Sequence, residues 1–307
     1  MLYYTFNTFL KEKFNERVQK ITLDAGLTCP NRDGTKGRGG CIYCDARGSG
    51  TGAHHDLPDI AAQARSAAAF LSRRYKAKKF IPYFQSFCNT YAPLETLKPL
   101  YDAAVSLPGA VGLSVATRPD CLCPEVLELL SSYTDRFMVW LELGMQTADD
   151  GTLKLINRGH THEEFLKGYY LAGNYPLLIC LHVIIGLPGE NSAHVHSTAR
   201  EVARLGPAGI KIHSLYIHRG TALEQWFRQG RFEPMQQETF VGLACDFLEL
   251  IPSKTVVQRL TGDPRAAELV APRWALRKQE TLQLIEKELI KRNSRQGKKY
   301  LKSRSLE

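Results

Sequence analysis

Short apolar runs alternate along the chain with longer segments of helical periodicity. Runs rich in β-branched and aromatic residues predict six strands, at 19–29, 79–86, 110–117, 137–146, 176–187 and 209–217. The segments between and after them predict helices, at 59–77, 94–107, 124–133, 149–156, 161–172, 192–205, 221–229, 236–251 and 273–292. The pattern is therefore that of repeated β-α units.

This alternation predicts an α/β fold in which a parallel sheet is covered by helices, because the strands are almost continuously apolar. Six β-α units are too few to close an eight-stranded barrel, so we expect an open, partial (β/α)6 barrel. We expect three parts: an N-terminal segment at 1–18, a core domain at 19–235, and a C-terminal helical extension with a basic tail at 236–307. The functional site is expected in the loops that follow the strands.

Composition narrows the class of protein. No apolar run reaches the length of a membrane span, and the N-terminus lacks the pattern of a signal peptide, so a cytoplasmic protein without a membrane partner is expected. In that compartment the eight cysteines favour metal or redox use over disulfides. The net charge of +9 is concentrated in two basic runs, 73–79 and 291–304. Each run alone is typical of a solvated surface, while the two together favour a polyanionic partner such as RNA.

Three of the cysteines, Cys29, Cys41 and Cys44, lie in the glycine-rich stretch "TCPNRDGTKGRGGCIYCD". A zinc site would need a fourth ligand, for which His54, His55 and Cys88 are candidates. A single nucleophilic cysteine would not explain three thiols. A [4Fe–4S] cluster held by three thiolates would leave one iron open to a bound molecule. The spacing alone does not decide between the cluster and zinc.

Polar residues follow each predicted strand, where the edge of a parallel sheet would bring them together. One charged residue, Glu142, stands inside an apolar run, which is costly unless the carboxylate is paired or functional. The glycines of "GLPGE" at 186–190 permit close approach of a ligand to the backbone. For any one of these residues, a satisfied polar group at the start of a loop is the simpler interpretation.

The chain resembles the radical S-adenosylmethionine (SAM) superfamily, and within it a bacterial family, uncharacterised or linked to tRNA modification, near the catalytic subunit of Elongator. The resemblance is carried by the cysteine motif and by "YFQSFCNTYAP", "TRPDCL", "ELGMQT", "INRGHT", "HVIIGLPGE", "KIHSLYIHRGT" and "RLTGD". Tyr43 fits the aromatic position before the third cysteine. Two departures stand out: eleven residues separate the first two cysteines where three are usual, and "QS" replaces the usual Gly-Gly-Glu after the second strand.

The resemblance implies a role for individual residues. Cys29, Cys41 and Cys44 would hold the cluster, and Gln85 and Ser86 would bind the amino group of SAM. Glu142 and Gln146 would face its ribose or methionine portion, and Arg158 its carboxylate. The remaining candidates are Ile185, Gly186 and Leu187 along the adenine with Tyr43 nearby, His213 and Leu215 on the sixth strand, and Cys121 as a hydrogen donor. Packing around the site is the alternative for each, and ordinary burial is the simpler one for Cys121.

The function implied is reductive cleavage of SAM to a 5′-deoxyadenosyl radical, with a reductase, flavodoxin or ferredoxin as electron donor. The resemblance and the basic runs favour the side chain of a wobble uridine in tRNA as the target. Two alternatives remain at this point. One is a radical SAM enzyme that acts on a small metabolite, and the other is a zinc-stabilised RNA-binding protein.

Overall fold

One parallel sheet forms the centre of the fold. The computed structural model describes residues 1–48 and 59–300. In that part of the chain the sheet has seven strands, and they stand in the order in which they occur along the sequence, with every neighbouring pair parallel. The strands are β1 (Val18–Leu23), β2 (Lys79–Phe84), β3 (Gly112–Thr117), β4 (Met138–Gln146), β5 (Leu178–Ile185), β6 (Gly209–Ser214) and β8 (Val256–Arg259).

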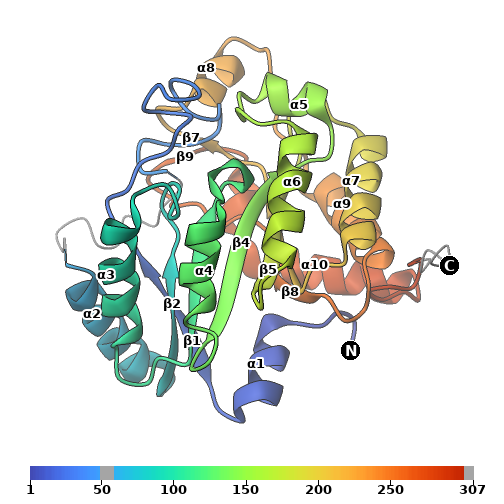
Figure 1. Cartoon of the computed structure of the whole chain (residues 1–307). Helices are drawn as coiled ribbons and strands as arrows, with labels where there is room; N and C mark the ends of the chain where they lie inside the picture. The colour runs from blue at the N-terminus through green and yellow to red at the C-terminus, as the bar shows by residue number, and fades with distance from the viewer. Residues whose placement is uncertain (49–58, 301–307) are drawn as a thin grey trace, which may run out of the picture.

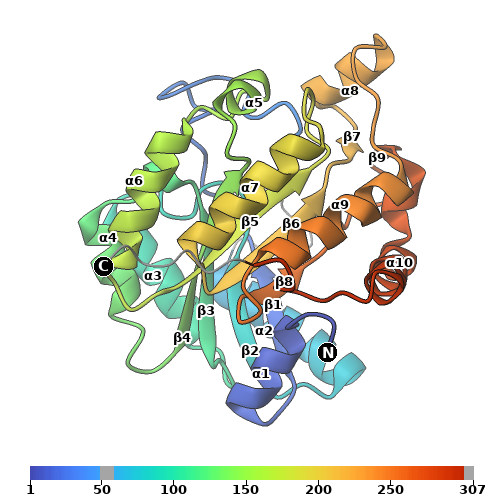
Figure 2. The same ribbon diagram turned by 90° about the vertical axis from the view of Figure 1, so that its right-hand side faces the viewer.

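Helices connect the strands and cover the outer face of the curved sheet (Figures 1 and 2). Those on the outer face are α2 (Ile60–Tyr75), α3 (Leu94–Val105), α4 (Pro124–Ser131), α6 (His162–Gly173), α7 (Ser192–Leu205) and α9 (Gln237–Leu250). Two shorter helices, α5 (Asp150–Leu155) and α8 (Ala222–Arg228), lie beyond the ends of the strands (Figures 1 and 2). Local sequence fixes where several begin: Asp59 caps α2, and Thr161 with Glu164 forms a capping box at α6. This arrangement is a half-barrel with its strand ends open at one side.

Short elements complete the chain. A two-stranded antiparallel sheet joins β7 (Ile217–His218) to β9 (Leu269–Ala271). Two 3-10 turns, η1 (Pro119–Cys121) and η2 (Arg273–Leu276), precede α4 and the final helix α10 (Lys278–Lys291). None of the helices in the described ranges is long and apolar enough to span a membrane.

The helix α1 (Phe6–Phe14) packs at the end of the sheet where the strands begin (Figure 1). The rings of Phe6 and Phe9 meet the edge of Trp140 on β4, with centroids 5.8 and 5.7 Å apart. Because side chains alternate along a strand, Trp140, Glu142 and Gly144 share one face of β4, and Gln146 follows after an irregularity in the pairing. The inner face of the sheet thus runs from this aromatic plug, through a charged level at Glu142, to the open end.

The partial barrel and its six predicted strands are confirmed, with bounds a few residues shorter than the apolar runs suggested. The structure adds a seventh strand, β8, which pairs with β6 and comes from the segment expected to be a helical extension. The division of the chain at residues 18 and 235 stays a prediction. The last described residues are also ordered against the body of the fold, because the buried Gln296 bonds to the carbonyls of Pro252 and Thr255 at 2.7 and 2.8 Å.

Candidate functional site

A cavity of about 490 Å³ opens at the end of the half-barrel where the strands finish. Its wall combines the cysteine loop after β1 with the ends of the strands, as expected for this class of fold. Ten of the residues selected from the sequence line it: Cys29, Cys41, Tyr43, Cys44, Gln85, Glu142, Gln146, Arg158, His213 and Leu215. The structure thus brings together side chains that are up to 186 positions apart, from Cys29 to Leu215.

The other five selected residues are not among those that line the cavity. Ser86, Ile185 and Leu187 are buried beside it, and Gly186 adopts a φ of +98° between them. Cys121 lies in η1 and hydrogen-bonds to the thiol of Cys88. Burial opposes ionisation of Cys88, but the hydrogen bonds from Cys121 and Thr117 lower its pKa to about 6. A catalytic role for Cys121 stays a prediction that the cavity does not support.

The cysteine loop is held by the segment that follows α5. Asn157 donates its side-chain amide to the Gly40 carbonyl at 2.8 Å, and its own carbonyl accepts from Asn31 at 2.6 Å. The Ile42 amide donates to the Ile156 carbonyl at 3.0 Å. Gly40 has a φ of +77°, and a Cβ there would lie 2.8 Å from Arg32 Nε. Glycine at that position is therefore required by both conformation and space.

Arg158 reaches from the same segment into the cavity. Its Nη2 donates to the Gly144 carbonyl at 2.8 Å, its Nε donates to His160 at 2.9 Å, and its Nη1 lies 3.8 Å from Cys41 Sγ. A Cβ on Gly144 would come within 2.6 Å of Nη2 and 2.5 Å of the Gln146 amide nitrogen, so glycine makes room for both. Gln146 itself has a φ of +70°, a strained conformation of the kind found at functional sites.

A second arginine supports this arrangement from the loop after β3. The guanidinium of Arg118 binds Asp120 through two hydrogen bonds of 2.9 and 3.0 Å, and its Nη1 donates to the Arg158 carbonyl at 2.8 Å. Burial would raise the pKa of Asp120, but Arg118 outweighs it and lowers that pKa to about 2. Burial, with the charge of Arg158, lowers the pKa of His160 to about 3, so its neutral ring accepts from Arg158.

The spacing of the cysteine sulfurs bears on the choice between zinc and a cluster. Two thiolates on one tetrahedral zinc ion lie about 3.8 Å apart. Within residues 1–48 and 59–300, the only set of three or more His, Cys, Asp or Glu with ligand atoms all within 4.8 Å is Asp45, His218 and Glu268, without any cysteine. The sulfurs of Cys29, Cys41 and Cys44 are therefore not all within 4.8 Å of one another, as three thiolates on a single zinc ion would be. His54 and His55 lie outside the described residues.

Glu142 is the centre of a charged cluster on the inner wall. It is fully buried, and its Oε1 accepts from Lys20 and from Ser114, the latter at 2.6 Å. Its Oε2 accepts from Lys211 and lies 2.7 Å from His182 Nε2. Burial alone would raise the pKa of Glu142, but the ammonium groups of Lys20 and Lys211 hold it well below its ordinary value. Both oxygens are therefore engaged within the protein, and Glu142 acts here as a counter-ion.

Burial also changes the bases around this carboxylate. It lowers the pKa of Lys211 to about 7, which the charge of Glu142 only partly offsets. It lowers the pKa of His182 to about 4, with Lys211 adding to the effect. The pKa of His213 lies well below its ordinary value because of burial and the charge of Arg259. The inner wall is thus lined by neutral imidazoles next to a few fixed charges.

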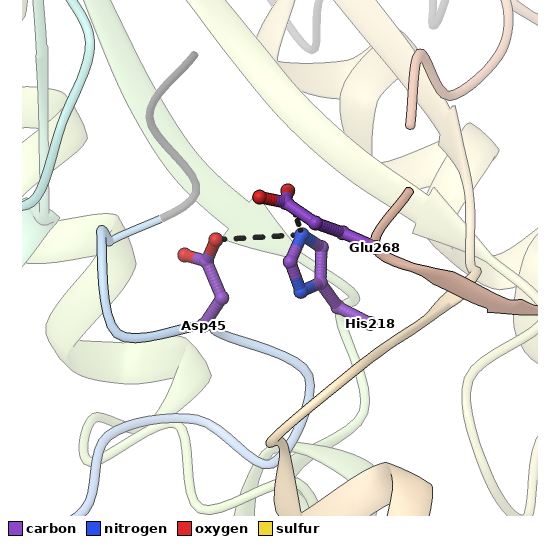
Figure 3. A group of neighbouring side chains, drawn as sticks. All are labelled: Asp45, His218 and Glu268. Carbon is purple, nitrogen blue, oxygen red and sulfur yellow. Dashed lines mark hydrogen bonds and ion pairs between the residues drawn. The ribbon is translucent and has the colours of Figure 1, made fainter. Parts of the chain in front are cut away.

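Asp45, His218 and Glu268 lie at the edge of the cavity (Figure 3). His218 Nε2 is 3.5 Å from the Asp45 carboxylate and 2.9 Å from the Glu268 carboxylate. Arg47 pairs with both carboxylates and neutralises part of their charge. Since Asp45 directly follows Cys44, this group ties the cysteine loop to the residues before β9.

The sequence analysis did not select several residues of this site. Lys20, His182 and Lys211 complete the Glu142 cluster, and Arg118 and Asn31 support the cysteine loop. The rule that singled out Glu142, a charge within an apolar strand, applies equally to Lys20 and Lys211 and would have found them. Arg259 was missed because its strand was not predicted.

Comparison with known families gives two matches that together span most of the chain. Residues 32–202 match the family described as the Radical SAM superfamily. Residues 207–291 match the family described as the Radical_SAM C-terminal domain. The second match begins near β6 and includes β8, so the added strand belongs to a recurrent part of such chains.

Individual relatives support the same grouping. The uncharacterized protein YtqA of Bacillus subtilis is 40% identical over 296 residues, which are 96% of this chain and 92% of that protein. The tRNA uridine(34) acetyltransferase of Dehalococcoides mccartyi is 34% identical over 157 residues, 50% of this chain and 33% of that protein. The structure of archaeal Elp3 from Methanocaldococcus infernus has the same fold, with a TM-score of 0.69 at 18% identity, over 91% of this chain and 64% of that one.

Proposed function

The chain belongs to the radical SAM superfamily, and from this premise we propose that it is an enzyme that modifies tRNA, at the side chain of a wobble uridine. The cofactors of the superfamily are a [4Fe–4S] cluster and SAM. The observation that carries the proposal is the convergence of Cys29, Cys41 and Cys44 on one cavity with Arg158 and Gln146.

The residues around the cavity fit these cofactors. The three cysteines would hold the cluster, and the loop glycines leave room for it beside the sheet. When bound, the cluster would supply the electron for the reductive cleavage of SAM. Arg158 would bind the methionine carboxylate, because a guanidinium offers a fixed pair of donors. Gln85 and Gln146 are the nearby amides for the amino group and ribose, and Leu215 is an apolar contact for the adenine.

The charged inner wall would position basic side chains around the cavity. The Glu142 cluster fixes the positions of Lys20, Lys211 and His182 without presenting a free carboxylate. The aromatic plug at Trp140 closes the far end of the barrel, so water would enter from the open side only. A cavity of about 490 Å³ is in the range of pockets for small ligands and for a base turned out of its stack.

The tRNA target is supported by the relative that acts, by its name, on tRNA uridine(34), and by the basic runs. Arg73, Arg74, Lys76 and Lys78 are exposed at and after the end of α2. The described part of the second run, residues 291–300, lies at the end of α10 on the opposite side of the molecule from α2 (Figure 1). The two runs would therefore contact different parts of a large substrate. A reductase, flavodoxin or ferredoxin would supply the electron, and the place of action would be the cytoplasm.

The enzyme class is tested by anaerobic reconstitution, with iron, sulfide and zinc counted per chain. Reduction with dithionite in the presence of SAM should give 5′-deoxyadenosine with about four irons per chain. Cys41→Ala should lose both iron and product, while Cys123→Ala, outside the cavity, should lose neither. Zinc at one per chain without iron uptake would overturn the assignment.

The substrate is tested separately. Nucleosides from tRNA of cells with and without the gene are compared by mass spectrometry, and a change confined to the wobble uridine is expected. Purified tRNA from the deletion strain should then acquire the missing modification when it is incubated with the reconstituted enzyme. Unchanged tRNA, together with active SAM cleavage, would move the substrate to a small metabolite.

A further inference from the structure

Arg259 is a cation of the cavity wall that pairs with no acidic residue in the described part of the chain. It ends β8, its Cα pairs in register with that of Lys211 on β6, and both residues line the cavity. Among the residues that the structure describes, the Arg259 guanidinium has neither a hydrogen-bond partner nor an ion pair, and the residue is only partly exposed. A guanidinium withdrawn from water without a partner is costly, so a charge from outside the chain is the natural complement.

Every carboxylate that lines the cavity already has a basic partner other than Arg259. Glu142 binds Lys20 and Lys211. Asp45 and Glu268 share Arg47 and His218. Asp263 binds Lys278 at 2.7 Å.

The inner wall consequently carries one cation without a carboxylate among the described residues. Lys20 and Lys211, the latter with its pKa lowered to about 7 by burial, share the carboxylate of Glu142, and neither of its oxygens is bound to Arg259. In barrels of this kind the interior is usually filled by branched apolar side chains, so a charged interior calls for a reason.

His213 provides a second, independent sign of an incomplete site. It projects from β6 into the same cavity wall, next to the ring of His182 at 5.3 Å between centroids. Its Nε2 is buried and has no hydrogen-bond partner among the described residues. Arg259, His213, Tyr83 and Tyr216 all line this one cavity, so the arginine faces a wall that also carries polar rings.

We propose that Arg259 and His213 form a subsite for an anionic group of the substrate, a carboxylate or a phosphate, on the inner wall of the barrel. The proposal rests on the proposed function in one respect only, that the substrate enters this cavity. Arg259 binds the anion with its planar pair of donors, and His213 adds a neutral contact. The subsite differs from the contact assigned to Arg158. Each nitrogen of that guanidinium makes one contact, with Gly144, His160 or Cys41, and only the remaining N–H groups of Nη1 and Nη2 are left for the methionine carboxylate.

The test uses the full-length, reconstituted protein loaded with SAM, with sodium phosphate and sodium acetate as probes against sodium chloride at equal ionic strength. Phenylglyoxal, which modifies arginine, is followed residue by residue by mass spectrometry. Modification of Arg259 should slow at least several-fold in phosphate or in acetate. Arg204, which binds Glu201 on the surface of α7, should not respond. The more effective anion identifies the chemistry: acetate indicates a carboxylate, phosphate a phosphate group.

Two variants complete the test. Arg259→Gln should have a melting temperature at least equal to that of the parent in chloride, because an uncompensated charge is removed. The parent should gain about 2–4 °C at tenfold excess of the better anion over its Kd, and the variant should gain none. Arg259→Lys should keep part of the gain.

Three outcomes would overturn the proposal: no protection of Arg259 by either anion, an equal gain in Arg259→Gln, or a loss of SAM affinity in Arg259→Gln, which would assign the residue to the cofactor. The measurements do not depend on tRNA, so a failure of the tRNA assignment leaves them unaffected.

Discussion

The Arg158 guanidinium lies 3.8 Å from Cys41 Sγ through Nη1, while its Nη2 donates to the Gly144 carbonyl at 2.8 Å. One side chain thus connects a candidate cluster ligand to the strand β4, which lines the cavity. Burial opposes its charge, but the neighbouring Cys41 and Tyr43 raise the pKa of Arg158 above its usual value. A fixed positive charge at this point favours both thiolate ligands and a carboxylate.

We expect Arg158→Lys to keep the cluster and weaken SAM binding. A lysine keeps the charge, but its single nitrogen cannot contact Gly144, His160 and Cys41 at the same time as the three guanidinium nitrogens do. Loss of one charged hydrogen bond costs about 1.5–3 kcal/mol, which corresponds to a Kd raised roughly 10- to 150-fold. Iron per chain and SAM affinity by equilibrium dialysis measure the two effects. Arg200→Lys, an exposed position on α7, is the control, and equal affinity in both variants would contradict the role.

The glycines of the cysteine loop give a matched pair of substitutions. Gly39 and Gly40 both have positive φ, at +81° and +77°, so alanine strains each backbone by about 1–2 kcal/mol. Only at Gly40 does the added Cβ meet a neighbour, Arg32 Nε at 2.8 Å. Gly40→Ala should therefore lose iron after reconstitution, and Gly39→Ala should retain most of it. Iron counts that fall equally would mean that the space around Gly40 does not matter.

The contrast between what the sequence predicted and what it missed has a physical cause. Strands and helices follow from local periodicity, and the positions of strand ends follow from the parallel topology, so ten of the selected residues line one cavity. Pairings across the sheet have no local signal: Lys20 meets Glu142 from 122 positions away. The strand β8 is four residues long and lies between helices, too short for its pattern to stand out.

The Arg118–Asp120 pair should make stability depend on pH at the acid end. The folded pKa of Asp120, about 2, lies below the unfolded value of roughly 3.9, so the pair stabilises the fold above pH ~4 and loses this as pH falls toward 2. The shift corresponds to roughly 3 kcal/mol. The free energy of unfolding, measured in urea, should fall less between pH 7 and pH 3 for Asp120→Asn than for the parent. Because both proteins share any acid lability of the cluster, the comparison isolates the contribution of the Asp120 carboxylate, which also binds Lys36 at 2.8 Å, and parallel curves would exclude that contribution.

The basic runs should contribute to tRNA binding separately. The slope of log Kobs against log salt is negative for a protein that binds phosphates. Replacing Arg73, Arg74, Lys76 and Lys78 by Gln should make this slope shallower by about 0.9 for each phosphate that these side chains neutralise in the parent. Replacing Arg295 and Lys298 at the other side of the molecule tests the second run. Lys154→Gln with Lys167→Gln, on α5 and α6, is the control for a general change in charge. Slopes that match the parent in every variant would leave the basic runs with a role in solubility alone.

Glu142 should be the most sensitive position of the inner wall. Glu142→Gln keeps the shape but leaves Lys20 and Lys211 facing each other without a counter-ion, which should destabilise the fold by about 3–5 kcal/mol. Glu163→Gln, an exposed partner of Lys167 on α6, should change little. Urea unfolding at pH 7 measures both. Adding Lys211→Met to Glu142→Gln should recover part of the loss, because one of the two uncompensated charges is removed. If the double variant were less stable than the single one, Lys211 would be held by its contact with Tyr83 and not by the carboxylate.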